Sequence, residues 1–223
     1  MKNEGVVDFP AYSPWYNSGK SYEEIQKIKD DYKANINSTG EVPTLVVDGN
    51  IIAEADVISE YLEDAFPTQG GSLMPVDAIQ RSKVRHWLKV LANNSGVNAH
   101  YALLKNQEPS QDESKIKDFY KGLESFCRMA SATGPFFLGE KISLADVMLA
   151  PFYDRFRHTL KFYRGVEYVP TDLEKFPWGV RAAAWAAAVE NSASFQQSSS
   201  TPEHYIALYS GYAGGRGAST IGS

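Results

Sequence analysis

The proline at position 43 constrains the fold of this chain more than any other residue. It stands in residues 40–45, Gly-Glu-Val-Pro-Thr-Leu, directly before a β-branched run. Proline has no backbone N–H to donate, so it is tolerated only at the beginning or the edge of a strand. X–Pro bonds are also the peptide bonds that adopt the cis form. The Val42–Pro43 bond is therefore predicted to be either a cis bond at the mouth of a strand or a trans bond that begins an edge strand.

The two alternatives differ in what Val42 offers to a ligand. In the cis alternative, the backbone N–H and C=O of Val42 face outward instead of joining the sheet. A peptide-like ligand can then pair with Val42 as if it were an added strand. In the trans alternative, Val42 and Pro43 only lead the chain into the sheet.

A β-hairpin and a helix are predicted after the proline. Residues 44–47 (Thr-Leu-Val-Val) form a short strand, Asp48-Gly49 is a turn pair, and Ile51 and Ile52 resume a strand. Residues 55–66 follow with apolar side chains at helical spacing, which predicts a helix that stops before Pro67. Upstream, the weaker pattern over 22–34 predicts a charged surface helix or an insertion.

Glu54 and Ala55 stand at the beginning of this predicted helix. A helix N-terminus offers unpaired amides and a partial positive charge. A ligand carboxylate can bind the N–H groups near Ala55 and Asp56, while the Glu54 carboxylate binds a ligand ammonium group. Alternatively, Glu54 only complements the dipole of its own helix.

The chain changes character near residue 75, where the proline- and glycine-bracketed stretch 67–75 reads as a linker. Long helical patterns follow, over 77–104 and 115–130. We expect a first domain at 1–69, an all-helical domain at 76–207 and a flexible, glycine-rich tail at 208–223.

Charge and composition exclude several classes of protein. The formal charge is −5, whereas a nucleic-acid surface needs clustered lysine and arginine. No apolar stretch is long enough for membrane insertion and the start is too polar for a signal peptide, so we expect a cytoplasmic protein. The single cysteine, Cys127, excludes an internal disulfide and a multi-cysteine metal site, and we interpret it as a buried apolar residue in preference to a reactive thiol.

Residues 37–62 resemble the second half of the N-terminal domain of the glutathione S-transferase family. The resemblance is continuous through the Val-Pro strand, the Asp-Gly turn and the acidic residue that opens the helix. It implies that Val42, before Pro43, pairs with the cysteinyl backbone of glutathione, and that Glu54 and Ala55 hold its γ-glutamyl end. The family typically has a serine at position 55, so Ala55 keeps the amide but not the hydroxyl, which predicts weaker binding.

Residues 137–151 carry a second resemblance, to the core helix of the family's all-helical domain. Ser143 and Asp146 have the spacing of a capping box at the beginning of that helix. Together the resemblances imply an α/β plus all-α fold, in which a partial thioredoxin-like domain precedes a helical bundle. The Asn-x-x-Gly-Glu-Val-Pro run from Asn37 is similar to the omega-like branch of the family.

The first strand and helix of the family's thioredoxin-like domain are expected to be missing, because residues 5–9 best fit its second strand. The catalytic Tyr, Ser or Cys would lie in that missing part, so no catalytic residue is assigned. A less favoured alternative reads residues 11–19 as the turn after the first strand, with Tyr12, Ser13 or Tyr16 stabilising the thiolate.

The resemblance implies two alternative functions. The first is a transferase that binds glutathione as co-substrate and transfers its thiol to a small electrophile or a disulfide, with Tyr101 or His86 near the electrophile. The second is a non-catalytic module that serves as a subunit or scaffold in a larger assembly. A homodimer or a protein partner is expected in either case, and no metal is expected.

Overall fold

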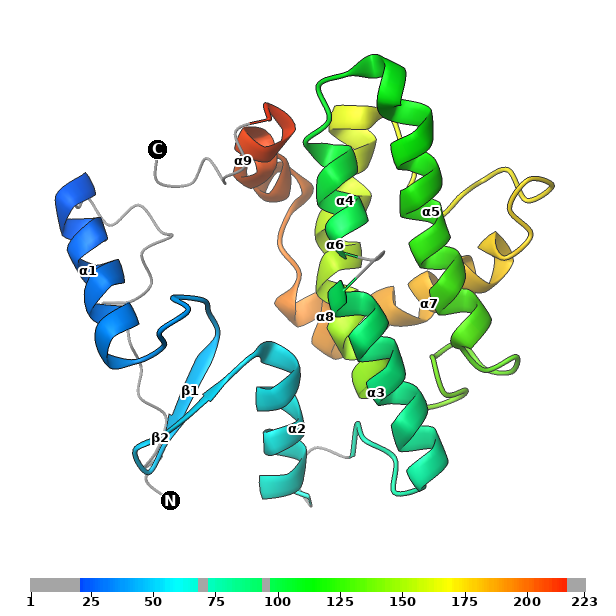
Figure 1. The fold of residues 1–223 in the computed structure, drawn as a ribbon. Helices are drawn as coiled ribbons and strands as arrows, with labels where there is room; N and C mark the ends of the chain where they lie inside the picture. The colour runs from blue at the N-terminus through cyan, green and yellow to red at the C-terminus, as the bar shows by residue number, and fades with distance from the viewer. Residues whose placement is uncertain (1–20, 68–71, 94–96, 216–223) are drawn as a thin grey trace. The chain divides into compact units, whose positions relative to one another are not determined.

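The computed structural model describes residues 21–67, 72–93 and 97–215 of the chain. The chain divides between residues 71 and 72 into two compact units, within the stretch expected to be a linker. The strand expected at 5–9 lies outside the described residues. Figure 1 labels the helices and strands of each unit.

The first unit consists, in its described part, of a helix, a hairpin and a second helix. The elements are α1 (Tyr22–Asn35), β1 (Thr44–Val47), β2 (Asn50–Ala53) and α2 (Ala55–Ala65). Helix α1 begins with a capping box, in which the Glu24 N–H donates to the Ser21 hydroxyl and the Ser21 N–H donates to the Glu24 carboxylate. The predicted helices at 22–34 and 55–66 are therefore confirmed.

The predicted hairpin is confirmed in position and turn. Strands β1 and β2 pair in antiparallel register, with Thr44 opposite Ala53. The turn residues Asp48 and Gly49 have φ angles of 49° and 78°. Two consecutive positive φ angles match the right-handed twist of the strands, which is why Asp-Gly favours this reversal.

The second unit is a bundle of helices. Its elements are α3 (Ala78–Asn93), α4 (Val97–Leu104), the 3₁₀ turn η2 (Pro109–Gln111), α5 (Asp112–Met129), α6 (Leu144–Arg164), α7 (Gly179–Glu190), α8 (Ala193–Ser198) and α9 (Pro202–Ala213). Within the helical run expected over 77–104, the described residues form α3 up to Asn93 and α4 from Val97. Residues 93–96 read Asn-Asn-Ser-Gly, all of low helix propensity.

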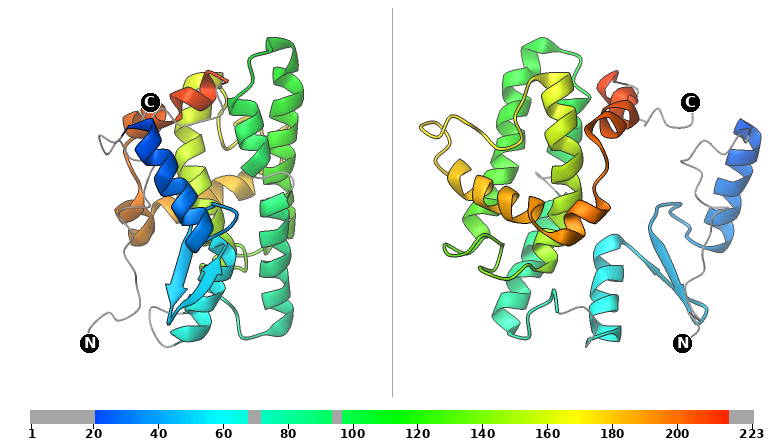
Figure 2. Two further views of the ribbon diagram at one scale, coloured as in Figure 1. Left: turned by 60° about the vertical axis from the view of Figure 1, so that its left-hand side comes forward. Right: turned by 180° about the vertical axis from the view of Figure 1, so that it is seen from behind.

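Helix α6 lies at the centre of the bundle. It packs against α3, α4, α7 and α9, and both views of Figure 2 show it, in yellow-green, beside its neighbours. An aromatic core fills the space around its first half. The Phe126 ring centroid lies 5.0 Å from that of Trp87 and 5.2 Å from that of Trp185, both in edge-on geometry.

Asp146, in the first turn of α6, joins three segments of this core. Its side chain is fully buried. It accepts hydrogen bonds from the Phe137 N–H (2.8 Å), the Ser143 N–H (2.8 Å), the Ser143 hydroxyl (2.7 Å) and the Trp185 Nε1–H (3.0 Å). Burial raises the pKa of the Asp146 carboxyl, although each of these hydrogen bonds lowers it. The expected capping box is present, and the same carboxylate also positions the preceding loop and α7.

The prediction of a flexible tail from residue 208 is wrong for residues 208–213. Helix α9 continues to Ala213, and Tyr209 and Ala213 are buried in the core. The Arg164 guanidinium on α6 donates to the Ala213 carbonyl at 2.8 Å, so the end of α9 is held by the central helix. Residues 216–223 lie outside the described part of the chain.

We expect Asp146→Ala to lower the free energy of unfolding of the second unit by about 3 kcal/mol or more, because it leaves several buried donors without an acceptor. Urea unfolding followed by tryptophan fluorescence measures this, since Trp87, Trp178 and Trp185 all lie in that unit. Glu140→Ala, at an exposed position in the preceding loop, is the matched control and should change stability by less than about 0.5 kcal/mol. A loss for Asp146→Ala as small as the control's would contradict the role assigned to this carboxylate.

Candidate functional site

Two buried side chains of the first unit hold the segment around Val42 and Pro43. The Tyr32 hydroxyl donates to the Glu41 carbonyl at 2.7 Å and lies 2.6 Å from the Thr44 hydroxyl. The Asn37 side-chain amide donates to the same two oxygens, at 3.0 and 3.2 Å. Tyr32 is 7% exposed and Asn37 9%. The backbone on either side of the Val42–Pro43 pair is therefore fixed from α1 and the turn that follows it.

Asn37 also shapes the turn itself. Its side-chain oxygen accepts from the N–H and the hydroxyl of Thr39, at 3.1 and 3.0 Å. The Gly40 N–H donates to the Asn37 carbonyl at 2.8 Å, and Gly40 has a φ of 75°. A glycine suits this position because other residues rarely adopt a positive φ.

Val42 and Pro43 lie just before the first strand. The peptide bond between them is cis, which confirms that alternative. Pairing of β1 with β2 begins at Thr44, so the Val42 backbone lies outside the sheet ladder. Its side chain is half exposed.

Glu54 occupies the N-cap position of α2 in an unusual backbone conformation. Its φ is 74°, its side chain is exposed, and it makes no side-chain capping hydrogen bond. Its carbonyl accepts from the Ile58 N–H at 2.9 Å, which is the first turn of the helix. A positive φ in a residue other than glycine costs on the order of 1–3 kcal/mol and is concentrated at functional sites.

Ala55 is the first residue of α2 and is partly buried. Its carbonyl accepts from the Ser59 hydroxyl at 2.7 Å. The Val57 N–H is taken by the Asp56 carboxylate at 2.9 Å. The amides of Ala55 and Asp56 lie at the start of the helix, where the backbone dipoles favour an anion.

The hairpin register brings the sequence-predicted residues to one place. Thr44, just after Pro43, pairs with Ala53, just before Glu54. The Val42–Pro43 pair and the Glu54–Ala55 pair consequently lie at the same end of the hairpin. Among the described residues, this end offers a strand edge, a carboxylate and a helix N-terminus, which are the groups that bind a short peptide with charged ends.

Other predicted residues do not join this site. Tyr12, Ser13 and Tyr16 lie outside the described residues. His86 is an exposed residue of α3. The Tyr101 hydroxyl lies 3.4 Å from that of Tyr209 within the second unit, and burial together with Tyr209 raises its pKa.

Cys127 on α5 is a partly buried thiol. Burial raises its pKa to about 12, against the lowering effect of Arg181. Because the thiolate is the reactive form, burial disfavours reaction of this thiol near neutral pH. The expectation of a packed apolar role agrees with this environment.

Neither a metal site nor a membrane-spanning helix is found among the described residues. No group of three or more His, Cys, Asp or Glu side chains there is placed to hold a metal ion. None of the helices in the same ranges combines the length and apolar character needed to cross a membrane.

Sequence reasoning missed an open groove in the second unit, between α5 and residues 175–178. Tyr120, Phe176 and Trp178 line it together with three lysines. The signal in the sequence is the Lys-Phe-Pro-Trp run at 175–178, which places two aromatic residues beside a proline in a loop.

Both halves of the chain match models of one protein family. Residues 18–70 match the N-terminal domain of glutathione S-transferase, and residues 89–192 match its C-terminal domain. The first match contains all four residues predicted to bind glutathione.

Individual relatives agree with these matches. The chain is 40% identical over 91 residues to Protein LigF of Sphingobium sp., a match that covers 38% of this chain and 35% of that protein. It is 27% identical over 165 residues to a probable glutathione S-transferase of Nicotiana tabacum, covering 71% of this chain and 69% of that one. The crystal structure of glutathione transferase Omega 3C from Trametes versicolor has a TM-score of 0.68 and 31% identity, covering 81% of this chain and 73% of that one.

We expect Asn37→Ala to loosen residues 37–44 while leaving the hairpin intact, because it removes donors to Glu41 and Thr44 and the acceptor of the Thr39 amide. Hydrogen exchange measured by mass spectrometry should show faster exchange in this segment and little change in β2. Asn35→Ala is the matched control, since the Asn35 side-chain amide donates to Asp31 in the preceding turn. Equal effects of the two substitutions would contradict the positioning role of Asn37.

Proposed function

This chain belongs to the glutathione S-transferase family, and we propose that it binds glutathione at the end of the hairpin where Val42 and Glu54 meet. The proposal extends to catalysis: the bound thiol is transferred to a small electrophile or a disulfide. One observation carries the binding step. In the register of β1 and β2, the Val42 segment, which Tyr32 and Asn37 hold on both sides, lies next to the N-terminus of α2. Glu54, directly before this helix, has a positive φ angle.

Two parts of the tripeptide, the cysteinyl backbone and the γ-glutamyl end, have matching groups at this site. The cysteinyl backbone of glutathione pairs with the Val42 N–H and C=O, as an added strand does. The γ-glutamyl carboxylate binds the amides of Ala55 and Asp56 at the start of α2. The γ-glutamyl ammonium binds the Glu54 carboxylate, which is exposed and makes no capping bond.

Transfer requires that the glutathione thiol lose its proton. The thiolate sulfur then forms a bond to an electrophilic carbon, whose leaving group departs with its bonding electron pair, or to one sulfur of a disulfide whose other sulfur leaves as a thiolate; the proton from the thiol passes to solvent, from which the leaving anion can be protonated. The proposed residues orient the tripeptide for this step. Tyr12, Ser13 and Tyr16 remain the candidates for stabilising the thiolate.

A non-catalytic module is the second candidate function, and Ala55 is the residue that favours it. Without a hydroxyl at this position, the γ-glutamyl carboxylate has one hydrogen bond fewer than in relatives with serine. We also propose that the protein is cytoplasmic and that it associates as a homodimer or with a protein partner. Both proposals rest on family membership.

We expect Glu54→Gln to weaken glutathione binding by roughly tenfold or more, because a hydrogen bond to a charged group is worth about 1.5–3 kcal/mol. Isothermal titration calorimetry with glutathione measures the dissociation constant. Asp64→Asn removes the same charge at the exposed far end of α2 and should leave the constant unchanged. Absence of binding to the unaltered chain up to millimolar glutathione would overturn the proposal and favour the module.

We expect Ala55→Ser to tighten glutathione binding by roughly ten- to a hundredfold, because it supplies the missing hydroxyl donor to the carboxylate. Ala65→Ser, at an exposed position in the last turn of α2, is the matched control. The same titration compares the two variants. If Ala55→Ser binds no more tightly than the control, the γ-glutamyl carboxylate does not lie at the start of this helix.

A further inference from the structure

The open groove of the second unit runs along α5. It has a volume of about 1220 Å³, and its lining residues extend on α5 from Glu113 to Glu124 and continue on the segment 175–178. An α-helix rises about 1.5 Å per residue, so this part of α5 is about 16 Å long. A polyproline II segment of about five residues has the same length. The groove therefore has the length of a site for a short extended peptide.

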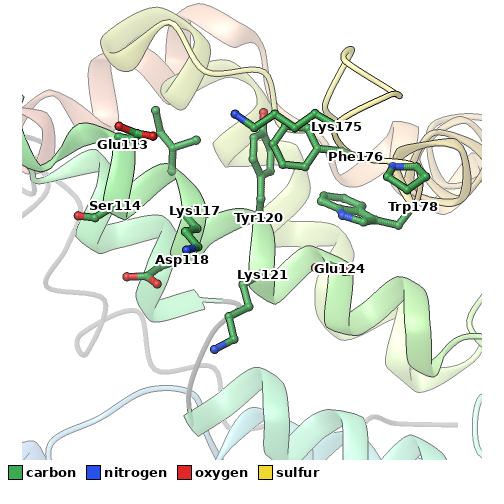
Figure 3. Close-up of a pocket in the computed structure, with 12 residues that line it drawn as sticks. Glu113, Ser114, Lys117, Asp118, Tyr120, Lys121, Glu124, Lys175, Phe176 and Trp178 are labelled. Carbon is green, nitrogen blue, oxygen red and sulfur yellow. The ribbon is translucent and has the colours of Figure 1, made fainter.

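Three aromatic rings and a proline form one wall of the groove. Figure 3 shows the side chains of Tyr120, Phe176 and Trp178 gathered on one side of it, and Pro177 also lines it. The ring centroids lie 4.8 Å apart for Tyr120 and Phe176, 5.9 Å for Tyr120 and Trp178, and 5.8 Å for Phe176 and Trp178. Phe176 and Trp178 keep part of their surface exposed. Proline rings pack against such a surface, and grooves lined by aromatic residues bind proline-rich segments in this way.

Hydrogen bonds hold this wall in place. Tyr120 is 8% exposed, and its hydroxyl donates to the Glu167 carbonyl at 2.8 Å. The Phe176 N–H donates to the Asp172 carbonyl at 2.9 Å, and the Gly179 N–H donates to the Phe176 carbonyl at 2.8 Å. A site that is ordered before binding loses less entropy when a peptide binds, and a polyproline II segment is itself extended before it binds.

The Trp178 indole adds a hydrogen-bond donor to the wall. Within the described part of the chain, its N–H has no hydrogen-bond acceptor. The Trp185 indole N–H, by contrast, donates to Asp146 at 3.0 Å. A polyproline II backbone makes no internal hydrogen bonds, so its carbonyl oxygens are available as acceptors. An unpaired indole N–H beside rings that can hold prolines consequently favours a peptide over a purely apolar ligand.

Three lysines surround the wall. Lys117 and Lys121 are one turn apart on α5, and Lys175 lies beside Phe176, with its Nζ 5.3 Å from the ring centroid. None of the three forms an ion pair within the described part of the chain. Like charges one helical turn apart repel each other, and acidic side chains of a partner would relieve that repulsion.

Acidic residues also line the groove, but they compensate these lysines only in part. Glu124 is paired with Arg128 at 2.6 Å, so its charge is already neutralised. Glu113 and Asp118 lie on the side of the groove away from Trp178 in Figure 3. Among the described lining residues, the unpaired lysines therefore outnumber the unpaired carboxylates. Charge complementarity favours a partner that carries acidic residues.

We propose that this groove binds an acidic, proline-rich segment of a protein partner in the polyproline II conformation. The proline rings pack against Tyr120, Phe176 and Trp178, and the Trp178 N–H donates to a carbonyl oxygen of the segment. The three lysines bind acidic side chains that flank the prolines. All lining residues belong to the second unit, so this docking site does not depend on the proposed glutathione site.

Three end-blocked synthetic peptides test the chemistry of the partner. The first has five prolines between two aspartates, one at each end because a polyproline II segment can bind in either direction. The second replaces the prolines by alternating glycine and serine, and the third replaces the aspartates by lysines. Isothermal titration calorimetry with the full chain should give binding of the first peptide, and binding roughly tenfold weaker or less for the other two.

Variants of the wall test the place of binding. Phe176→Leu should weaken the first peptide roughly tenfold, because it removes a ring, whereas Phe162→Leu, at a 63% exposed position of α6, is the matched control and should not. Trp178→Phe keeps a ring but removes the N–H, and should weaken this peptide several-fold. In ¹H–¹⁵N spectra the Trp178 indole signal, identified by its absence from Trp178→Phe, should shift when the peptide is added.

Variants of the lysines test the role of charge. Lys117→Gln/Lys121→Gln should weaken the first peptide several-fold and reduce the dependence of its affinity on salt. Lys83→Gln/Lys89→Gln removes the same charge from exposed positions of α3 and should leave the affinity unchanged. Circular dichroism shows whether each variant remains folded. If Phe176→Leu unfolds the bundle, Trp178→Phe and the lysine pairs decide the question.

The proposal fails if none of the peptides binds at millimolar concentration, or if the glycine–serine peptide binds as tightly as the proline peptide. It also fails if the groove variants and their matched controls have equal effects. Sedimentation equilibrium excludes a second copy as the occupant. A dimer of the unaltered chain that becomes a monomer in Trp178→Phe would show that another copy of the chain covers the groove, and would equally overturn the proposal.

Discussion

The carboxylate of Asp146 is the interaction on which the second unit depends. A buried charge without partners would cost several kcal/mol, so the fold has to supply donors from separate segments. Phe137 comes from the preceding loop, Ser143 from the helix cap and Trp185 from α7. The hydrogen bonds to this one side chain fix the start of α6. Helices α3, α4, α7 and α9 pack around α6.

The first unit uses the same principle on a smaller scale. Tyr32 and Asn37 are buried polar residues whose side chains both form hydrogen bonds with Glu41 and Thr44. Their hydrogen bonds fix the backbone on both sides of Val42 and Pro43, while the hairpin fixes that pair relative to Glu54. A binding site made of backbone groups gains precision from such support, because backbone donors cannot adjust by changing rotamer.

Local signals predicted much of this arrangement. The Asp48-Gly49 turn and the Ser143–Asp146 capping box each depend on a few neighbouring residues, and each is present. For the Val42–Pro43 bond the motif left two alternatives, of which the structure has the cis form. The error occurred where the local signal was misleading. Helix α9 extends into a glycine-containing stretch that was expected to be a tail, because Tyr209 and Ala213 pack on the core.

The sequence by itself determined the family, the order of the elements from α1 to α2 and the four residues proposed to hold glutathione, because these follow from short motifs with defined turns and caps. Only the tertiary structure decided that Asn37 and Tyr32 support the Val42 segment, and that Tyr120 meets Phe176 and Trp178 across a groove lined by lysines. The Asn37 bonds reach only Glu41 and Thr44, whereas the Tyr120 contacts join α5 to the distant segment 176–178, and the geometry of both depends on how helices and loops pack. Packing is a property of the whole core, which periodicity and motif spacing do not encode.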